Sequence, residues 1–321
     1  MKFWYASVNH GLELAVGRII KNRGAKDIET LGSAITFSCP HEIDVKCINN
    51  LFIVLSSRFS DDVLGIARKM SRENFQFPPL NGKTFRIVVM DCGKLRSVPY
   101  DTMKGLEKNV SRQTGLSVNR ANPDVEIWLN RRNDSAVYFM VRVKKHPPFD
   151  KTLKKGELRP DVVDVMIREA KISKNAVVAD LFGGWGAIAA GVGESGQYKK
   201  IYTGDINDEC VRHQKKRLRN TRDCLVQKWD ARQLPLENMS VDVIVTDPPW
   251  GEYEAINAPQ FYDEFIREAA RVLRPGGTFA LLTSAQNEAR SSLGRRGFDH
   301  SQIPLKIGGK DAFLLCAKPR A

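Results

Sequence analysis

The chain has 321 residues, of which 42% are hydrophobic, 27% charged and 8% aromatic. This composition excludes disordered, collagen-like and coiled-coil proteins, and at about 150 residues per domain the length predicts two domains. The net charge is +13, and residues 1–150 alone hold 23 basic against 15 acidic residues, hence +8. A basic excess spread over a folded chain favours a polyanionic partner such as nucleic acid, with a merely soluble basic protein as the alternative.

The front half of the chain alternates short apolar strands with amphipathic helices. We expect strands at 2–7, 34–38, 51–57, 84–91, 125–129 and 136–143, and helices at 11–22, 61–70 and 100–113. This mixture predicts an α+β region over residues 1–145. The stretch KKHPPFDKTLKKGELRP, at 144–160, is rich in proline and lysine, and it predicts a linker at 146–160 before a second domain at 161–321.

The back half alternates more strictly. Apolar runs at 176–181, 201–204, 241–246 and 278–282 are separated by segments of helical length. Strands that alternate with helices predict an α/β domain, with a parallel sheet covered by helices on both faces. Ligands of such sheets bind at the carboxyl ends of the strands, so we expect the functional residues to follow these apolar runs.

The first of these strand ends is rich in glycine. It reads Asp180-Leu181-Phe182-Gly183-Gly184-Trp185-Gly186, and Asp205 follows about 20 residues later. Glycines let the backbone turn tightly and approach a ligand at a helix N-terminus. The spacing also satisfies a dinucleotide fingerprint, so an NAD-binding domain is an alternative. An acid before the glycines would repel a pyrophosphate and instead favours a cationic ligand group, such as a methionine moiety that carries positive charge.

A later strand, VDVIVT, ends in the tetrapeptide Asp247-Pro248-Pro249-Trp250. Two consecutive prolines fix the backbone and remove two N–H donors, which leaves the carbonyls free to accept. A carboxylate beside a rigid carbonyl suits an exocyclic amine, N2 of guanine or N6 of adenine, and the aromatic ring can stack on the base. The alternative is a rigid turn that ends in an ordinary surface tryptophan.

These motifs resemble those of class I S-adenosylmethionine-dependent methyltransferases with a (D/N)PP(Y/F/W) motif. The segment WYASVNHGLELAVGRIIKNRGAKDI resembles the ferredoxin-like part of THUMP-containing RNA methyltransferases, and TFRIVVMDCGK and NPDVEIWLNRRNDSAVYFMVRV resemble the THUMP domain itself. The resemblance is closest to tRNA guanine-N2 methyltransferases. It implies a Rossmann-like domain with a mostly parallel seven-stranded sheet, S-adenosylmethionine as cofactor, and N2-methylation of a guanosine in tRNA.

The resemblance also implies a role for each residue of the two strand ends and their neighbours. The amino-acid end of the cofactor would be held by Asp180, Phe182, Gly183, Gly184 and Gly186, its ribose by Asp205, and its adenine by Ile206, Asp230 and Ala231. Asp247, Pro248, Pro249 and Trp250 would hold the target base. One departure is Trp185, since FGGWGA replaces the more usual FCGSGT.

Six basic residues of the front region are candidate RNA contacts: Lys83, Arg86, Arg112, Arg120, Arg131 and Arg132. Two further hypotheses remain beside tRNA guanine-N2 methylation. One is an N6-adenine methyltransferase that acts on RNA or DNA, and the other is an inactive RNA-binding protein with a methyltransferase-like fold.

The sequence also indicates where the protein works. Its apolar runs are too short to cross a bilayer, and its N-terminus, MKFWYASVNHGLE, has no pattern of an export signal. The cysteines form no CxxC pair and stand at no metal-ligand spacing; they are Cys39, Cys47, Cys92, Cys210, Cys224 and Cys316. We therefore expect reduced thiols, no metal and no membrane partner, in a cytoplasmic monomer.

Overall fold

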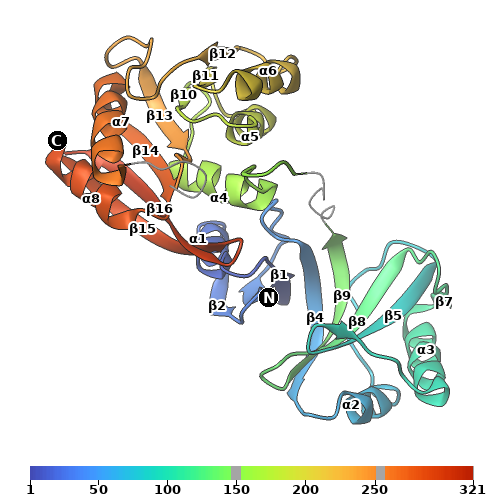
Figure 1. Ribbon diagram of the computed structural model, residues 1–321. Helices are drawn as coiled ribbons and strands as arrows, with labels where there is room; N and C mark the ends of the chain where they lie inside the picture. Colours follow the sequence, from blue (N-terminus) through green and yellow to red (C-terminus); the bar gives the residue numbers. More distant parts are fainter. Residues whose placement is uncertain (146–152, 251–256, 321) are drawn as a thin grey trace. The chain divides into compact units, whose positions relative to one another are not determined.

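The computed structural model describes residues 1–145, 153–250 and 257–320, and the chain divides into two compact units (Figure 1). The first unit comprises residues 1–8, 24–43 and 48–147, and the second comprises 9–23, 44–47 and 148–321. The expected linker falls partly outside the described residues, at 146–152. Its remainder belongs to the second unit and leads into a helix that begins at Pro160.

The first unit is a nine-stranded sheet with two helices. The strands are β1 (Lys2–Ser7), β2 (Lys26–Thr30), β3 (Ala34–Cys39), β4 (Asn50–Phe59), β5 (Thr84–Asp91), β6 (Lys94–Leu95), β7 (Ser117–Val118), β8 (Val125–Arg131) and β9 (Ala136–Lys145). Their order is β2-β3-β1-β4-β9-β8-β5-β6, with β7 beside β5. The helices α2 (Val63–Met70) and α3 (Tyr100–Thr114) bury Met70 and Val110 against Phe85, Ile127 and Phe139 of the sheet.

The second unit is a seven-stranded sheet between two layers of helices. Its strands are β10 (Val177–Asp180), β11 (Lys200–Asp205), β12 (Cys224–Lys228), β13 (Val241–Thr246), β14 (Leu273–Thr283), β15 (Phe298–Ile307) and β16 (Lys310–Pro319). The order is β12-β11-β10-β13-β14-β16-β15, parallel from β12 to β14 and antiparallel at β16 and β15. The mostly parallel α/β sheet expected from the sequence is confirmed.

Helices cover both faces of this sheet (Figure 1). They are α4 (Pro160–Ala170), α5 (Ala187–Ser195), α6 (Asp208–Arg217), α7 (Ala258–Val272) and α8 (Gln286–Arg295). On one face, Tyr262 and Phe265 of α7 and Leu293 of α8 share a buried core with Phe279 of β14, while α4, α5 and α6 contact the sheet on the other side. Because both faces are covered, the parallel strands read as continuous apolar runs, which made them visible in the sequence.

One N-terminal helix differs from the expected domain division. The helix α1 (Glu13–Lys21) lies against α4 and β15 of the second unit, although the sequence places it inside the region 1–145. Polar contacts hold the flanking segments there as well: Asn9 Nδ2 donates to Asp161 Oδ2, and the Cys47 N–H donates to Asp164 Oδ2 at 3.1 Å. An amphipathic pattern shows that a helix has an apolar face but not which sheet that face covers.

No helix among residues 1–145, 153–250 and 257–320 is long and apolar enough to cross a membrane. In the same ranges, His, Cys, Asp and Glu side chains form no group of three or more that could hold a metal ion.

Candidate active site

Three carboxylates lie at the carboxyl edge of the parallel strands in the second unit. Asp180 is the last residue of β10, Asp205 is the last residue of β11, and Asp247 directly follows β13. These strands are adjacent in the order β11-β10-β13. Burial is the main cause of the raised pKa values of Asp180 and Asp247, and smaller contributions come from the charge of Asp205 on Asp180 and from that of Asp180 on Asp247.

The loop after β10 is closed by backbone hydrogen bonds. The Gly184 N–H donates to Asp205 Oδ2 at 2.8 Å, and the Gly183 N–H donates to the Gly204 carbonyl at 2.8 Å. A Cβ at Gly183 would lie 2.5 Å from Thr203 Oγ1 and 2.6 Å from Gln214 Nε2. Only glycine therefore lets this loop approach β11 so closely, and the loop leads into the N-terminus of α5 at Gly186.

Thr246, the last residue of β13, connects this loop by hydrogen bonds to the strand that precedes Asp247-Pro248-Pro249-Trp250, here called the DPPW segment. Its hydroxyl donates to Asp180 Oδ1 at 3.0 Å and accepts the N–H groups of Leu181 and Phe182, each at 3.1 Å. Thr246 was not among the site residues expected from the sequence. The available signal was a hydroxyl at the end of an otherwise apolar strand interior, directly before Asp247.

Asp180 is a buried acid with one unused oxygen. Its exposed fraction is 1%, and Oδ2 has no hydrogen-bond partner among the described residues. Burial raises the pKa of this carboxyl to about 7, against the opposing effect of the Thr246 hydrogen bond. A buried oxygen without a partner is costly, so this position is suited to a ligand that brings a cationic donor.

The Asp205 carboxylate has two backbone donors, since its Oδ1 also accepts from the Asn207 N–H at 2.9 Å. Each oxygen keeps a lone pair for a further donor. The next residue, Ile206, is 59% exposed, so an apolar surface lies beside this carboxylate.

The Asp230 carboxylate already has hydrogen-bond donors from within the protein, which the sequence did not indicate. Its carboxylate accepts from the Arg232 guanidinium at 2.7 and 3.0 Å and from the Arg232 N–H at 2.9 Å. These contacts hold the pKa of Asp230 below its usual value. The adjacent Ala231 is buried. Any ligand amine at Asp230 has to share the carboxylate with Arg232.

In the DPPW segment, the tryptophan binds the aspartate. Trp250 Nε1 donates to Asp247 Oδ1 at 2.8 Å, and both side chains are half-buried, while Pro248 is buried and Pro249 half-buried. Within the described residues, no further hydrogen bond reaches the Asp247 carboxylate. Burial raises the pKa of Asp247 to about 8, the Trp250 hydrogen bond opposes this shift, and the Asp180 charge adds to it.

A cavity of about 440 Å³ opens in front of this segment. One wall is Asp247, Pro248, Pro249 and Trp250, a second is residues 156–159, and a third is formed by Ile307, Gly308 and Lys310 around the β15–β16 turn. The second and third walls were missed from the sequence. The strand β15 alternates buried and exposed residues and contains Pro304, so it shows no continuous apolar run, whereas β16 holds the apolar stretch at 312–317.

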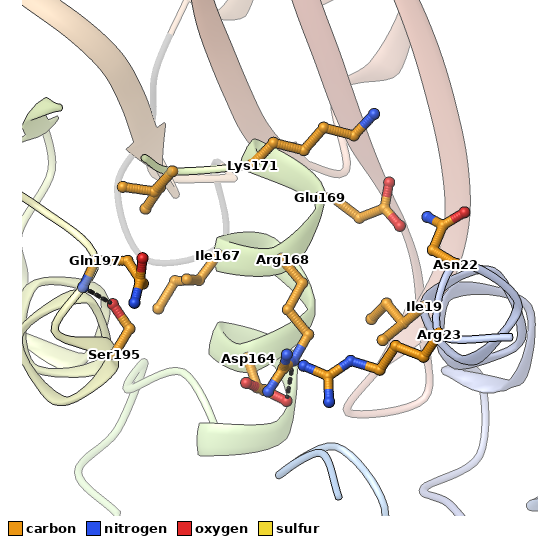
Figure 2. A pocket seen from close by; sticks show the side chains of 11 residues that line it. Ile19, Asn22, Arg23, Asp164, Ile167, Arg168, Glu169, Lys171, Ser195 and Gln197 are labelled. Atoms are coloured by element: carbon orange, nitrogen blue, oxygen red, sulfur yellow. Dashed lines mark hydrogen bonds and ion pairs between the residues drawn. The ribbon is translucent and has the colours of Figure 1, made fainter. Parts of the chain in front are cut away.

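Another cavity, of about 600 Å³, lies between the end of α1, α4 and the turn after α5 (Figure 2). Both carboxylates in its lining already have cationic partners: Arg168 donates to Asp164 at 2.9 Å, and Glu169 Oε2 lies 3.8 Å from Nη2 of Arg18, outside the lining. No site residue expected from the sequence lines it. We therefore place the candidate active site at the cavity of the DPPW segment.

Five of the six candidate RNA contacts are engaged within the first unit. Arg120 holds Glu107 through two bonds of 2.8 Å, Arg131 donates to Asp91 at 2.7 Å, and Arg132 donates to Tyr5 Oη at 3.0 Å. Arg86 binds Glu126 and Arg112 binds Asn74 and Asn109, whereas Lys83 is exposed. Their role in RNA binding stays a prediction.

Comparison with known proteins identifies the second unit. A family model described as "RMKL-like, methyltransferase domain" matches residues 150–311. The chain is 28% identical over 223 residues to a Thermus thermophilus protein named tRNA (guanine(6)-N2)-methyltransferase, and the match covers 64% of each chain. The chain thus spans just under two thirds of the length of this relative.

Two solved structures resemble the whole fold. TrmN from Thermus thermophilus superposes with a TM-score of 0.72 at 20% identity and 100% coverage of both chains. SMU.472, solved in complex with SAH, gives a TM-score of 0.69 at 12% identity, with 100% of this chain and 98% of that chain covered. At such identities the likeness establishes the fold of both units.

Proposed function

Because this chain belongs to the family of RMKL-like methyltransferase domains, we propose that it transfers a methyl group from S-adenosylmethionine to N2 of a guanosine in tRNA. The observation that carries the proposal is the carboxyl edge of the sheet, where Asp247 and its tryptophan face one cavity close to two further acids. The relative named as a tRNA guanine-N2 methyltransferase supports the choice of substrate.

The residues at this edge fit the cofactor. The unpartnered Oδ2 of Asp180 suits an ammonium group, and the closed glycine loop leaves no room for a Cβ at Gly183. Asp180 and the loop would bind the amino-acid end, Asp205 the ribose hydroxyls, and the exposed side chain of Ile206 the adenine ring. Asp230 and Ala231 would bind the adenine edge. When bound, the cofactor supplies a methyl group that is already activated by a positively charged sulfur.

Asp247 and Pro248 would orient the target amine. Trp250 occupies Oδ1 of Asp247, which leaves Oδ2 to accept one amine N–H, and the Pro248 carbonyl would accept the other. Both N–H groups held in this way direct the nitrogen lone pair out of their plane. Such positioning of a nucleophile is the main requirement when the group to be transferred is already activated.

The carboxylate also serves the charge that develops on the amine. Positive charge builds on the nitrogen as it bonds to the methyl carbon, and a preorganised carboxylate stabilises it. Because the pKa of Asp247 is raised to about 8 in the ligand-free protein, its carboxylate form grows as the pH rises through that value, and this form can accept the proton that the nitrogen releases. The faces of the Trp250 ring take no part in its N–H bond, so they can stack on the base.

The first unit would supply RNA affinity, in keeping with the resemblance of its sequence to THUMP domains and with the basic excess of residues 1–150. Contacts to phosphates add affinity without reading sequence, so we assign target choice to the cavity and docking to the first unit. We expect the protein to act as a cytoplasmic monomer.

Nucleoside analysis tests this function. The full-length protein is incubated with unmodified tRNA and methyl-labelled cofactor, and the RNA is digested and resolved by chromatography with mass spectrometry. N2-methylguanosine is the expected product. Labelled N6-methyladenosine, from RNA or from DNA in a parallel reaction, would select the adenine hypothesis instead. RNA binding without any labelled product, in an assay where a known methyltransferase works, would select the inactive RNA-binding protein.

A further inference from the structure

Trp185 is the residue of the glycine loop that the cofactor role does not explain. It stands where the resembling family carries a small residue, and in the structure its ring contacts two consecutive residues of another segment. Its indole Nε1 donates to the Lys155 carbonyl at 2.9 Å, and Lys154 Nζ lies 4.0 Å from the centre of its ring. One side chain therefore provides both a hydrogen bond and a cation–π contact.

The segment that Trp185 contacts is a closed turn, here called the Lys154 turn (residues 154–157). The Glu157 N–H donates to the Lys154 carbonyl at 2.9 Å, and the Lys154 N–H donates to Glu157 Oε2 at 3.1 Å. Gly156 has a φ of +76°, the conformation that glycine adopts at the third position of such a turn. The turn thus has a defined shape that can dock as a unit.

A second set of contacts joins the Lys154 turn to α6 and back to Trp185. Arg217 Nη1 binds Glu157 Oε1 at 2.5 Å, and the side chain of Glu157 is only 8% exposed. The same guanidinium donates to the Trp185 carbonyl at 3.1 Å. His213 Nδ1 lies 3.1 Å from that carbonyl, and its ring meets the indole edge to face at 5.4 Å. Both the ring and the backbone of Trp185 are therefore fixed.

The Lys154 turn also borders the candidate active site. Gly156 and Glu157, followed by Leu158 and Arg159, form the wall of the cavity that the DPPW segment shares. The glycine loop and the wall of the reaction cavity are thus connected by the ring of Trp185 and by the Arg217 guanidinium. A small residue at position 185 would leave the loop intact but would remove both ring contacts to the turn.

We propose that Trp185 is a positioning residue that latches the Lys154 turn onto the glycine loop, so that the cavity wall is ordered and release of the bound cofactor is slowed. The second half of this inference rests on the proposed function, since it requires S-adenosylmethionine or its product to bind at the loop. The ordering of the cavity wall concerns the ligand-free protein alone. Each of the two parts of the proposal can therefore be refuted without the other.

The test compares Trp185→Ser, Trp185→Phe and Lys154→Met in the full-length protein. Trp185→Phe keeps the ring face for Lys154 but lacks the N–H donor, and Lys154→Met does the reverse. Lys200→Met is the matched control, because Lys200 Nζ makes a cation–π contact of 4.7 Å with Tyr202 outside the turn. Hydrogen exchange of residues 153–159 is measured without ligand, and dissociation of S-adenosylhomocysteine is measured by stopped flow.

We expect Trp185→Ser to raise amide exchange at Lys154 and Glu157 about tenfold, as the loss of two modest contacts implies, with β10 and β13 unchanged. S-adenosylhomocysteine should dissociate about tenfold faster, and the two single-contact variants should fall between Trp185→Ser and the control. Unchanged exchange in all three variants would overturn the latch. Raised exchange with unchanged dissociation would overturn its effect on the cofactor.

Two outcomes separate this inference from the proposed function. If wild-type protein binds no S-adenosylhomocysteine, the proposed cofactor is wrong, while the exchange measurement still decides the latch. If Trp185→Ser fails to fold, Trp185→Phe and Lys154→Met decide it, because each removes one contact and leaves the other. If amide exchange of the Lys154 turn is as slow in both Trp185→Phe and Lys154→Met as in the Lys200→Met control, the latch is refuted.

Discussion

Asp180→Asn should stabilise the ligand-free protein at pH 8. The carboxyl is buried and its pKa is raised from 3.8 to about 7, so folding favours its neutral form. Stability from this group is present at acidic pH, below the pKa of the unfolded chain, and is lost as the pH rises through about 7. A shift of about 3 pKa units corresponds to roughly 4 kcal/mol as an upper limit. Asparagine has a similar shape and no charge, so the variant does not lose this stability as the pH rises.

The assay is urea unfolding of both proteins at pH 5 and pH 8. The control is Asp263→Asn, because Arg295 and Arg296 hold the pKa of Asp263 below its usual value, so that its charge does not change in this range. Wild type and the control should lose more stability than Asp180→Asn between the two pH values. Equal losses in all three proteins would refute the burial argument. Asp180→Asn should also weaken binding of S-adenosylhomocysteine, because the variant lacks the carboxylate that we propose binds the ammonium group of this ligand.

Three further predictions concern cofactor, base and RNA. Asp205→Ala should weaken S-adenosylhomocysteine binding in calorimetry by about 1–3 kcal/mol, since ribose hydroxyls lose their acceptor; unchanged affinity would contradict the ribose role. Trp250→Phe keeps an aromatic ring but removes the donor to Asp247, so the pKa of Asp247 should increase. The methylation rate should then increase with pH only at higher pH than in wild type, and a pH–rate profile equal to that of wild type would contradict this. RNA affinity should fall steeply with salt, and Lys83→Ala should reduce that salt slope by about one if its ammonium meets a phosphate; an unchanged slope would exclude the contact.

The sequence predicted the positions of the three acids, because these follow directly from the fold. Strands buried on both faces are continuous apolar runs, and a parallel sheet brings their carboxyl ends together, so Asp180, Asp205 and Asp247 could be placed at one edge without coordinates. The strand β15 could not be found in this way, because it alternates buried and exposed residues and contains Pro304. The cavity wall at Ile307–Lys310 was missed with it.

Contacts between distant segments were beyond the sequence. Nothing in the pattern of residues 11–22 shows that α1 packs on α4 and β15, and nothing near Trp185 shows that its partners are Lys154 and Lys155. The basic residues of the first unit pose the same problem. Arg86 and Glu126 are 40 positions apart and become partners only because β5 pairs with β8, so a charge count overstates the free cations.

The most direct test of the catalytic role of the DPPW site is Asp247→Ala, examined by single-turnover methylation together with melting temperature and with binding of S-adenosylhomocysteine and tRNA. Loss of one preorganised contact to a charge that develops in the transition state lowers rates by roughly 10²- to 10³-fold. We expect such a loss in a protein that is stable and binds both ligands as tightly as wild type. A variant that melts early but methylates at the wild-type rate would contradict it and reduce the DPPW segment to a rigid turn.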